Sequence, residues 1–368
     1  MKTEEFLQEK FRKYYNETEM RLPPRFTRRE YGFMFFGSSM MLRHTAFTSA
    51  HAFKRFLVDR APAHIFYSAA YYNRPDEKRM EDKAWRGADL IFDLDADHLS
   101  LPQQCTYEMM LGMVKEETKK LVEDFLVRDF GFEDMEIVFS GSRGYHIHIY
   151  DEKVLSLDSR GRREIMDYIT GNGMNTEILL GKDSYVIPSV GEPGWYGRIG
   201  RAVRDYAASL LALDRDSAIR ELKEIKGIGN VKAEKVYDGL KKMQSNPKAI
   251  NALPKEFTDY VIKNISIESS RGEADEPVTS DIRRLIRLPT SLHGKTGLVV
   301  KPLTLEEFDS FDPLQDAIAF GESEVEVQVL KPFSMRIKDF SAEESEGRIV
   351  MPEYAAVFAC ARGFCGSL

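Results

Sequence analysis

Two aspartates that follow an apolar run are the strongest candidates for chemistry in this chain. Asp93 comes directly after Leu90, Ile91 and Phe92, and Asp95 lies two positions further on. On a β-strand, side chains two positions apart point to the same face, so the two carboxylates would lie side by side. Such carboxylates are typical ligands of Mg²⁺ or Mn²⁺, and pairs of these ions catalyse phosphoryl transfer. An acidic turn after a strand would use the same residues, so the pair alone leaves both interpretations open.

A glycine-containing turn supplies a second group of candidates, suited to phosphate binding. Ser140, Arg143 and His146 surround two glycines between runs of alternating apolar and polar residues, which predict a β-hairpin over residues 136–150. Glycines let backbone amides approach an anion closely, and with these three side chains they suit a triphosphate. A plain hairpin turn with a half-buried histidine is the simpler interpretation. A zinc site formed by His146 and His148 is a third.

A third segment combines an acid with several cations. Asp275 precedes an arginine-rich stretch that we expect to be a basic helix, and a loop with His293 follows it. Arginine and lysine side chains are well suited to phosphate contacts. The cations in question are Arg283, Arg284, Arg287 and Lys295. An exposed basic helix balanced by neighbouring acids is the simpler alternative.

A fourth segment resembles a helix-hairpin-helix motif. Gly227 and Gly229 separate two predicted helices, and Lys232 follows in the second helix. In that motif the turn amides and the N-terminus of the second helix bind a nucleic-acid phosphate without reading the base sequence. A simple pair of antiparallel helices would show the same pattern.

The composition is that of an ordinary globular protein. Of the 368 residues, 43% are hydrophobic and 30% are charged, which is enough material for two domains or for one domain with a large insertion. The net charge of −7 argues against non-specific nucleic-acid binding over the whole surface, although a local basic groove is compatible with it. The three cysteines predict no disulfide framework, and no apolar run is long enough for a membrane span or a signal peptide. We therefore expect a cytoplasmic protein without membrane contact.

The elements that must position these residues form a core that is split in the sequence. Amphipathic patterns predict helices at 3–20, 48–60 and 108–130, and strands at 65–68, 90–95 and 298–300. We expect an α/β (α+β) catalytic core with a mixed or antiparallel sheet and an inserted, mainly helical domain. The expected boundaries are 1–158 and 271–368 for the core and 159–270 for the insertion.

Three of the segments described above, in their order along the chain, together resemble the catalytic small subunit of the archaeal and eukaryotic-type DNA primase family, in its archaeal form. The motifs are Phe92-Asp93-Leu94-Asp95, Ser140-Gly141-x-Arg143-Gly144-x-His146, and Asp275 followed by Arg287-Leu288-Pro289-x-Ser291-Leu292-His293-Gly294-Lys295-Thr296-Gly297. The resemblance implies a primase-type core and template-directed synthesis of short RNA primers on single-stranded DNA during replication. It also implies extension with deoxynucleotides.

The resemblance also implies roles for individual residues and for partners. Asp93, Asp95 and Asp275 would bind two catalytic Mg²⁺ or Mn²⁺ ions. The phosphates of the incoming nucleotide would be held by Ser140, Arg143, His146, Arg287 and His293, with Arg29 near the nucleotide. The implied partners are a large iron–sulfur subunit in a heterodimer, the single-stranded template and nucleoside triphosphates.

One feature departs from the family pattern. Family members commonly carry a zinc-binding cluster soon after the aspartate pair, whereas this region offers only His98 and Cys105. Two ligands cannot complete a tetrahedral site, so we expect no structural zinc.

Two other classes of protein share part of the pattern. A phosphatase of the haloacid-dehalogenase type also has an aspartate pair after an apolar strand, but its motif requires Thr or Val where this chain has Asp97. A non-catalytic DNA-binding protein would explain the helix-hairpin-helix segment but not the three acids.

Overall fold

The computed structural model describes residues 3–99, 102, 104–180, 187–246 and 253–368, and these divide between two compact units. Unit one comprises Met1–Thr118, Phe132–Arg163 and Ala274–Leu368, and unit two comprises Lys119–Gly131 and Glu164–Glu273. Most of the segment predicted as an insertion lies in unit two. That unit also takes in the second part of the helix predicted over residues 108–130.

Unit one contains two four-stranded sheets, with strand orders β2-β1-β3-β9 and β10-β7-β8-β6. Every pairing within them is antiparallel, in agreement with the predicted fold class. The first sheet consists of β1 (Tyr31–Met34), β2 (Met41–Thr45), β3 (His64–Ser68) and β9 (Leu285–Arg287). The second consists of β6 (Leu90–Asp95), β7 (Met135–Phe139), β8 (Gly144–Ile149) and β10 (Lys301–Leu303). The predicted hairpin over residues 136–150 is confirmed by β7 and β8.

Two predictions for the segment after Asp275 are wrong. In place of a basic helix, the chain forms the short helix α11 (Glu276–Ser280) and then strand β9. The reason is tertiary, because Ile286 of β9 pairs with Tyr67 of β3 and is only 4% exposed. The strand expected at residues 298–300 is reduced to an isolated bridge, and β10 begins at Lys301.

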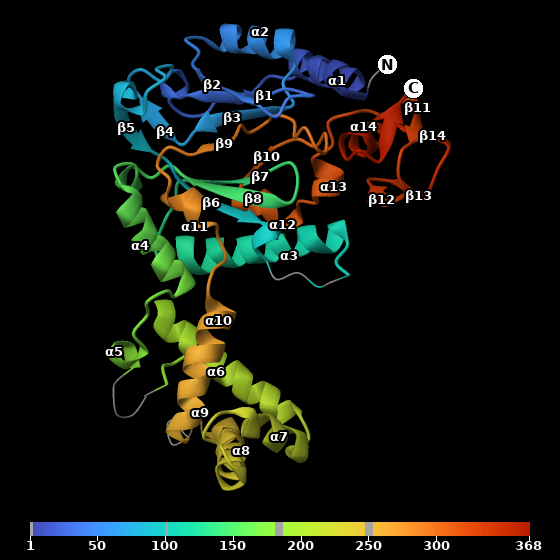
Figure 1. The fold of residues 1–368 in the computed structure, drawn as a ribbon. Coiled ribbons are helices and arrows are strands. Elements are labelled where there is room, and N and C mark those ends of the chain that lie inside the picture. The colour runs from blue at the N-terminus through green and yellow to red at the C-terminus, as the bar shows by residue number, and fades with distance from the viewer. Residues whose placement is uncertain (1–2, 100–101, 103, 181–186, 247–252) are drawn as a thin grey trace. The chain divides into compact units, whose positions relative to one another are not determined.

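Helices cover the outer sides of the two sheets. In Figure 1, α1 (Thr3–Glu17) and α2 (Ala50–Arg60) lie along the first sheet, and α3 (Tyr107–Lys120) lies along the second. Apolar side chains on α1 and α2, such as Phe11 and Leu57, are fully buried. The predicted helices are therefore present, although the first ends three residues earlier than expected.

Smaller elements complete unit one. A three-stranded sheet of order β14-β11-β15 packs against the buried helix α14, and strand β12 of a two-stranded hairpin contacts α13. These are β11 (Glu324–Val329), β12 (Phe333–Ile337), β13 (Phe340–Glu344), β14 (Arg348–Pro352), α14 (Glu353–Ala361) and β15 (Cys365–Ser367). The others are β4 (Ala70–Tyr72), β5 (Trp85–Ala88), α12 (Leu305–Ser310) and α13 (Pro313–Asp316). Helix α4 (Ser159–Thr170) begins in unit one and continues into unit two. Short 3₁₀ turns are η1 (Phe26–Arg28), η2 (Met80–Lys83), η3 (Ala96–His98) and η5 (Glu152–Val154).

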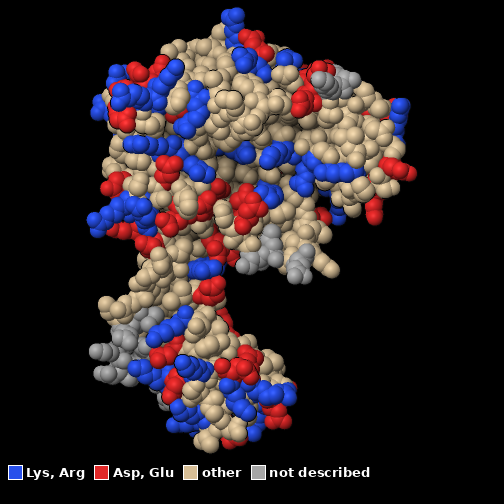
Figure 2. Space-filling view, viewed as in Figure 1, with Lys and Arg blue, Asp and Glu red and all other residues tan. Residues whose placement is uncertain are grey.

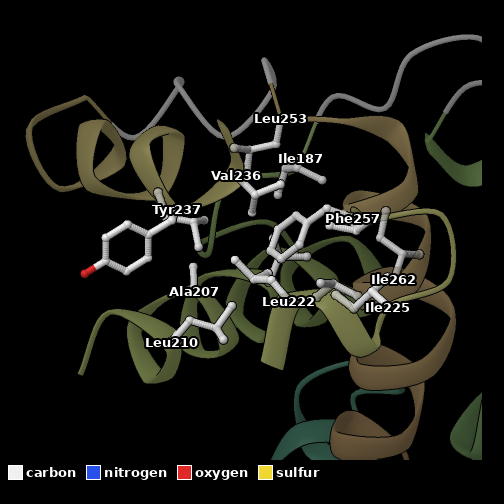
Figure 3. Close-up of a cluster of buried hydrophobic side chains, with 14 of the residues drawn as sticks. Ile187, Ala207, Leu210, Leu222, Ile225, Val236, Tyr237, Leu253, Phe257 and Ile262 are labelled. Atoms are coloured by element: carbon white, nitrogen blue, oxygen red, sulfur yellow. The ribbon is translucent and has the colours of Figure 1, made fainter. Parts of the chain in front are cut away.

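The regular secondary structure described in unit two is entirely helical, and its core is apolar. Figure 3 shows side chains from several helices converging, among them Leu222, Val236 and Phe257, all fully buried. The α-helices are α5 (Thr176–Leu180), α6 (Gly194–Ala212), α7 (Arg215–Glu224), α8 (Asn230–Ser245), α9 (Lys255–Tyr260) and α10 (Ile267–Ser270). Two π-helical segments are η4 (Leu121–Val127) and η7 (Val261–Ser266).

The two signs of charge are partly separated on the surface of unit one. Figure 2 shows Lys and Arg side chains in a band across the viewed face, with a group of Asp and Glu side chains beside it. The protein therefore has a local basic surface even though its net charge is −7.

Candidate active site

One cavity in unit one collects most of the residues that the sequence singled out. It has a volume of about 630 Å³ and receives side chains from both four-stranded sheets and from the loops beside them. The predicted site residues that line it are Asp93, Asp95, Ser140, Arg143, His146, Arg287 and His293. Residues up to 200 positions apart in the sequence therefore share one space, which supports a common function.

Two carboxylates from β6, Asp93 and Asp95, line one side of the cavity. With the neighbouring Asp275 they form a group that we call the acidic wall. In the antiparallel register of β6 and β8, Asp93 lies opposite His146 and Asp95 lies opposite Gly144. The Nε2 atom of His146 is 3.5 Å from Oδ1 of Asp93. Residue 144 must be glycine, because a Cβ atom there would collide with the carbonyl oxygen of Leu94. The close approach of the two strands thus depends on the glycine of the predicted turn.

Asp275 joins this wall through its backbone. Its amide donates a hydrogen bond of 2.8 Å to the carbonyl oxygen of Asp93, and α11 begins at the next residue. The Asp275 side chain is 17% exposed, and its Oδ2 lies 3.9 Å from Nε2 of His98. Asp275 is not among the residues that line the cavity, although its charge acts on Asp93.

The negative charge of the acidic wall is not fully balanced by nearby positive groups. Burial, together with the neighbouring carboxylates of Asp95 and Asp275, raises the pKa of Asp93 to about 7. Carboxylates in such a group repel one another unless a cation lies among them. The wall therefore has the electrostatic character of a site that binds cations.

Two turns that pack on each other form part of the opposite, basic wall, defined as Ser140, Arg143, Arg287, His293 and Lys295. The Thr296 hydroxyl donates a hydrogen bond of 2.5 Å to the Gly141 carbonyl. Within the second turn, the amide of His293 donates to the carbonyl of Leu298 at 2.9 Å. Gly141 has a φ of +81°, a conformation that favours glycine. These contacts bring the glycine turn after β7 and the His293 loop together.

Arg287 extends the basic wall from the first sheet. It pairs with Phe66 across β9 and β3, and its guanidinium lies 5.0 Å from the centre of the Phe66 ring. Nη1 of Arg287 is 2.8 Å from Nδ1 of His64. Burial lowers the pKa of Arg287 to about 10, against the opposing effect of Asp93 and Asp95. The guanidinium is still charged at neutral pH and has no carboxylate partner within 4 Å among the described residues.

The buried histidines around the cavity are neutral. Burial, reinforced by nearby cations, lowers the pKa of His64 to about 3 and holds the pKa values of His146 and His293 well below the ordinary value. Nδ1 of His146 is buried without a hydrogen-bond partner. A neutral imidazole can donate one hydrogen bond to a phosphate without adding a buried charge.

Arg29 does not lie at the cavity. Its side chain is fully buried and forms an ion pair of 2.7 Å with Asp89. The guanidinium also donates to the carbonyl oxygens of Pro24, Ser68 and Ala69. These four contacts occupy most of the N–H donors of Arg29, and its expected place near the nucleotide stays a prediction. Arg29 stabilises the core of unit one.

Arg143 lines the cavity but is ion-paired within the protein. Its Nη2 lies 2.5 Å from Oδ2 of Asp97 and 3.7 Å from Oδ1 of Asp95. Asp97 is 62% exposed, so this pair is held weakly against solvent. A phosphate at the turn would compete with Asp97 for the guanidinium.

Nine of the residues that line the cavity were not predicted as site residues, and five of these have side chains that bear on its chemistry. Arg284 and Lys295 were expected only to suit phosphate contacts in general, and Phe66, Met110 and Arg362 carried no signal. The last three come from β3, α3 and the residue after α14, so only the tertiary fold brings them to the site.

The donors present suit a divalent cation, although no preformed cage exists. Among the residues that the structure describes, no group of three His, Cys, Asp or Glu side chains is arranged to hold a metal ion. The oxygen donors of Asp93 and Asp95 are of the type that Mg²⁺ and Mn²⁺ prefer, and the raised pKa of Asp93 shows that positive charge is lacking there. The expectation of no structural zinc stays a prediction, because residues 100, 101 and 103 lie outside the described part of the chain.

Comparison with known proteins assigns the family. The family model for the DNA primase small subunit matches residues 92–305. The chain is 42% identical to the DNA primase small subunit of Methanothrix thermoacetophila, over 99% of this chain and 98% of the relative. It is 41% identical to that of Archaeoglobus fulgidus, again over 99% of this chain and 98% of the relative. The chain belongs to the DNA primase small subunit family.

Family membership confirms the predicted resemblance and the predicted activity. The chain is a DNA primase small subunit-type nucleotidyltransferase, an enzyme of primer synthesis in DNA replication. Neither a haloacid-dehalogenase-type phosphatase nor a non-catalytic DNA-binding protein agrees with this assignment. In the described parts of the chain, no helix has the length and apolar character needed to cross a membrane.

Solved structures match the chain as well. The polymerase domain of Mycobacterium tuberculosis ligase D in complex with DNA aligns over 83% of each chain, with 16% sequence identity and a TM-score of 0.37.

Proposed function

We propose that the cavity binds a nucleoside triphosphate between its acidic and basic walls and transfers the nucleotide to a 3′-hydroxyl on a single-stranded DNA template. The observation that carries this proposal is the presence of Asp93 and Asp95 in one cavity with Arg287, His293 and Lys295. Phosphoryl transfer requires cations at the reacting oxygens and hydrogen-bond donors on the phosphates, and the two walls supply sites for both.

The acidic wall would hold the metal ions. Asp93, Asp95 and Asp275 are the proposed ligands of two Mg²⁺ or Mn²⁺ ions, and the raised pKa of Asp93 supports this because bound cations would relieve the repulsion. When bound, such ions lower the pKa of the attacking hydroxyl and neutralise charge on the leaving pyrophosphate.

The basic wall would orient the triphosphate. Arg287 and Lys295 supply positive charge, and Ser140 and His293 supply neutral hydrogen-bond donors. Arg143 would exchange its contact with the exposed Asp97 for a phosphate oxygen. His146, opposite Asp93 in the strand register, would stand where the two walls meet.

The resemblance to the family supports further proposals about partners. We propose that the chain acts in the cytoplasm as a heterodimer with a large, iron–sulfur-containing primase subunit. Its substrates would be ribonucleoside triphosphates for short RNA primers and deoxynucleotides for extension.

The experiment that tests the proposal is synthesis on an unprimed single-stranded DNA template. Labelled ribonucleoside triphosphates are supplied with Mg²⁺ or Mn²⁺, to the native protein and to a double variant with Asp93→Asn and Asp95→Asn. Metal-dependent oligomers from the native protein alone are expected. If the native protein makes no labelled oligomers, even with a large subunit added, the proposal is contradicted.

A second proposed function is binding of DNA by the turn between α7 and α8 in unit two. Ile225 and Ile228 are buried under the turn, and Gly227 and Gly229 are exposed, so the backbone of the turn faces solvent. Gly227 has a φ of +91°, and no atom lies within 4 Å of a Cβ built on Gly229. We propose that the turn amides and the N-terminus of α8 bind a phosphate of the template or product duplex.

Lys232 is ion-paired beside the turn, and its expected phosphate contact stays a prediction. Its Nζ lies 2.6 Å from Oε1 of Glu256 and 3.2 Å from the carbonyl oxygen of Gly227. The lysine therefore holds the turn in place, and the backbone amides are left as the proposed phosphate contacts.

A charge at the start of α8 tests the turn. Val231 is 82% exposed, so Val231→Glu adds a carboxylate that favours the helix N-terminus but repels phosphate. DNA affinity is expected to fall about three- to tenfold at low salt. Leu305→Glu, at the first position of α12 in unit one, is the matched control and is expected to change nothing. Equal affinity of the two variants would exclude the turn from DNA binding.

A further inference from the structure

Arg362 brings the C-terminal part of the chain to the catalytic cavity. It follows α14 directly and lies outside residues 92–305, which the family model matches. With Ala361 it lines the catalytic cavity, and it also lines a second cavity of about 590 Å³. Its side chain therefore stands between the two cavities.

Three aromatic rings hold the Arg362 guanidinium. Its Cζ atom lies 4.7 Å from the ring centre of Tyr107, 5.5 Å from that of Phe364 and 5.7 Å from that of Phe358. Cation–π contacts of this kind orient a guanidinium without neutralising its charge. Within the described residues, Arg362 forms no ion pair with a carboxylate.

Tyr107 connects Arg362 to the glycine turn of the basic wall. Its hydroxyl donates a hydrogen bond of 2.6 Å to the carbonyl oxygen of Ser142. The same ring thus contacts Arg362 and fixes the turn that carries Ser140 and Arg143. Arg362 consequently lies at the end of the cavity where phosphates are proposed to bind.

A second arginine of the neighbouring cavity provides a contrast. Arg336 lines only the second cavity, is 66% exposed, and has Nη1 3.7 Å from Oε1 of Glu108. Arg362 differs in being half-buried, surrounded by aromatic rings and free of a carboxylate partner. A positive charge in such surroundings is incompletely compensated until an anion binds.

We propose that Arg362 binds the outer phosphates of the incoming nucleoside triphosphate, which leave together as pyrophosphate. This inference rests on the proposed function of the cavity and adds a phosphate-binding residue from the C-terminal segment. Arg362 is thus a contact for the β- and γ-phosphates and not for the α-phosphorus at which bonds change.

The test compares ligands that differ only in their outer phosphates. Binding of a ribonucleoside triphosphate and of the matching monophosphate is measured with Mg²⁺ for the native protein, Arg362→Gln and Arg362→Lys. Arg362→Gln is expected to weaken triphosphate binding about five- to thirtyfold and to leave monophosphate binding unchanged. Inhibition of synthesis by added pyrophosphate should weaken to a similar extent. Arg362→Lys keeps the charge and is expected to show an intermediate effect.

Arg336→Gln is the control for loss of a nearby arginine and is expected to leave both affinities unchanged. Thermal unfolding of each variant shows whether the fold is intact. If Arg362→Gln weakens both ligands equally, or neither, the inference is wrong. If instead the native protein makes no primers, the proposed function itself fails, so the two failures are distinguishable.

Discussion

The acidic and basic walls of the catalytic cavity differ in the sign of their charge, but both contain charged groups that lack a neutralising partner. On the acidic wall, burial and neighbouring carboxylates raise the pKa of Asp93 to about 7. On the basic wall, burial lowers the pKa of Arg287 to about 10. Each wall thus holds charged groups that the rest of the protein does not neutralise.

Because their charges are opposite, the two walls are complementary to different ligands. Cations would relieve the repulsion on the acidic wall, and phosphates would neutralise the arginine of the basic wall. A metal-bound nucleoside triphosphate carries both kinds of charge. On the proposed function, the cavity would therefore be preorganised for this ligand at a cost in stability to the free protein. Unit two offers a contrast, because its core is an apolar cluster and its buried Arg198 is ion-paired with Asp129 at 2.6 Å.

The largest expected effect comes from the acidic wall. Asp93→Asn removes a proposed metal ligand and is expected to lower kcat at least about a thousandfold, with template binding nearly unchanged. Asp59→Asn makes the same chemical change at a residue that is 63% exposed on α2 and serves as the control. Primer synthesis and binding of labelled single-stranded DNA are measured in parallel. Loss of template binding in Asp93→Asn would argue against a role confined to the metals.

A smaller effect is expected on the basic wall. Arg287→Ala removes a proposed phosphate contact and should lower kcat/KM about ten- to hundredfold, mainly through a higher KM for the nucleotide. Steady-state kinetics with varied nucleotide concentration measure the change. Arg55→Ala, at a residue 77% exposed on α2, is the control. An unchanged KM would remove Arg287 from the phosphate site and would weaken the distinction between the walls.

The acidic wall should also be visible in stability without metal. Because the Asp93 carboxyl group binds its proton more tightly in the folded protein, its contribution to stability is greatest below its ordinary pKa of 3.8 and is lost as the pH rises through about 7. Asp93→Asn is therefore expected to stabilise the metal-free protein at pH 8 by about 1–3 kcal/mol. Chemical denaturation in the presence of a chelator, at pH 5 and pH 8, measures the difference. A variant that is no more stable than the native protein at pH 8 would show that repulsion at this wall is negligible.

The smallest expected effect concerns a buried histidine behind the walls. Burial lowers the pKa of His148 from 6.5 to about 3, so its contribution to stability is present above pH 6.5 and is lost as the pH falls towards 3. Its Nδ1 lies 3.2 Å from the Tyr67 hydroxyl. His148→Gln should therefore reduce the loss of stability between pH 7 and pH 5 by about 1–2 kcal/mol. The exposed His51→Gln is the control. Parallel pH dependences for all three proteins would contradict the assignment of a neutral, buried His148.

The elements with local signals could be predicted from the sequence. The alternation around the glycine turn after β7 predicted the hairpin, because strand pairing across a short turn depends on neighbouring residues only. The apolar run before Asp93 likewise predicted a buried strand that ends in two carboxylates on one face. Three motifs in a fixed order then led to the family and to the activity, since spacing of this kind is itself part of the sequence.

The tertiary structure decided which charged residues reach the cavity. Arg29 is fully buried and Arg287 is half-buried. Asp89 and backbone carbonyls occupy the donors of Arg29, whereas the pairing of β9 with β3 brings Arg287 to the site. Three aromatic rings place Arg362. Phe358 and Phe364 are near it in the sequence, whereas Tyr107 is far away and reaches it only in the folded chain. A sequence specifies residue types and local periodicity, but burial and the identity of each charge's partner are properties of the packed chain. Those properties set the pKa values and therefore the chemistry.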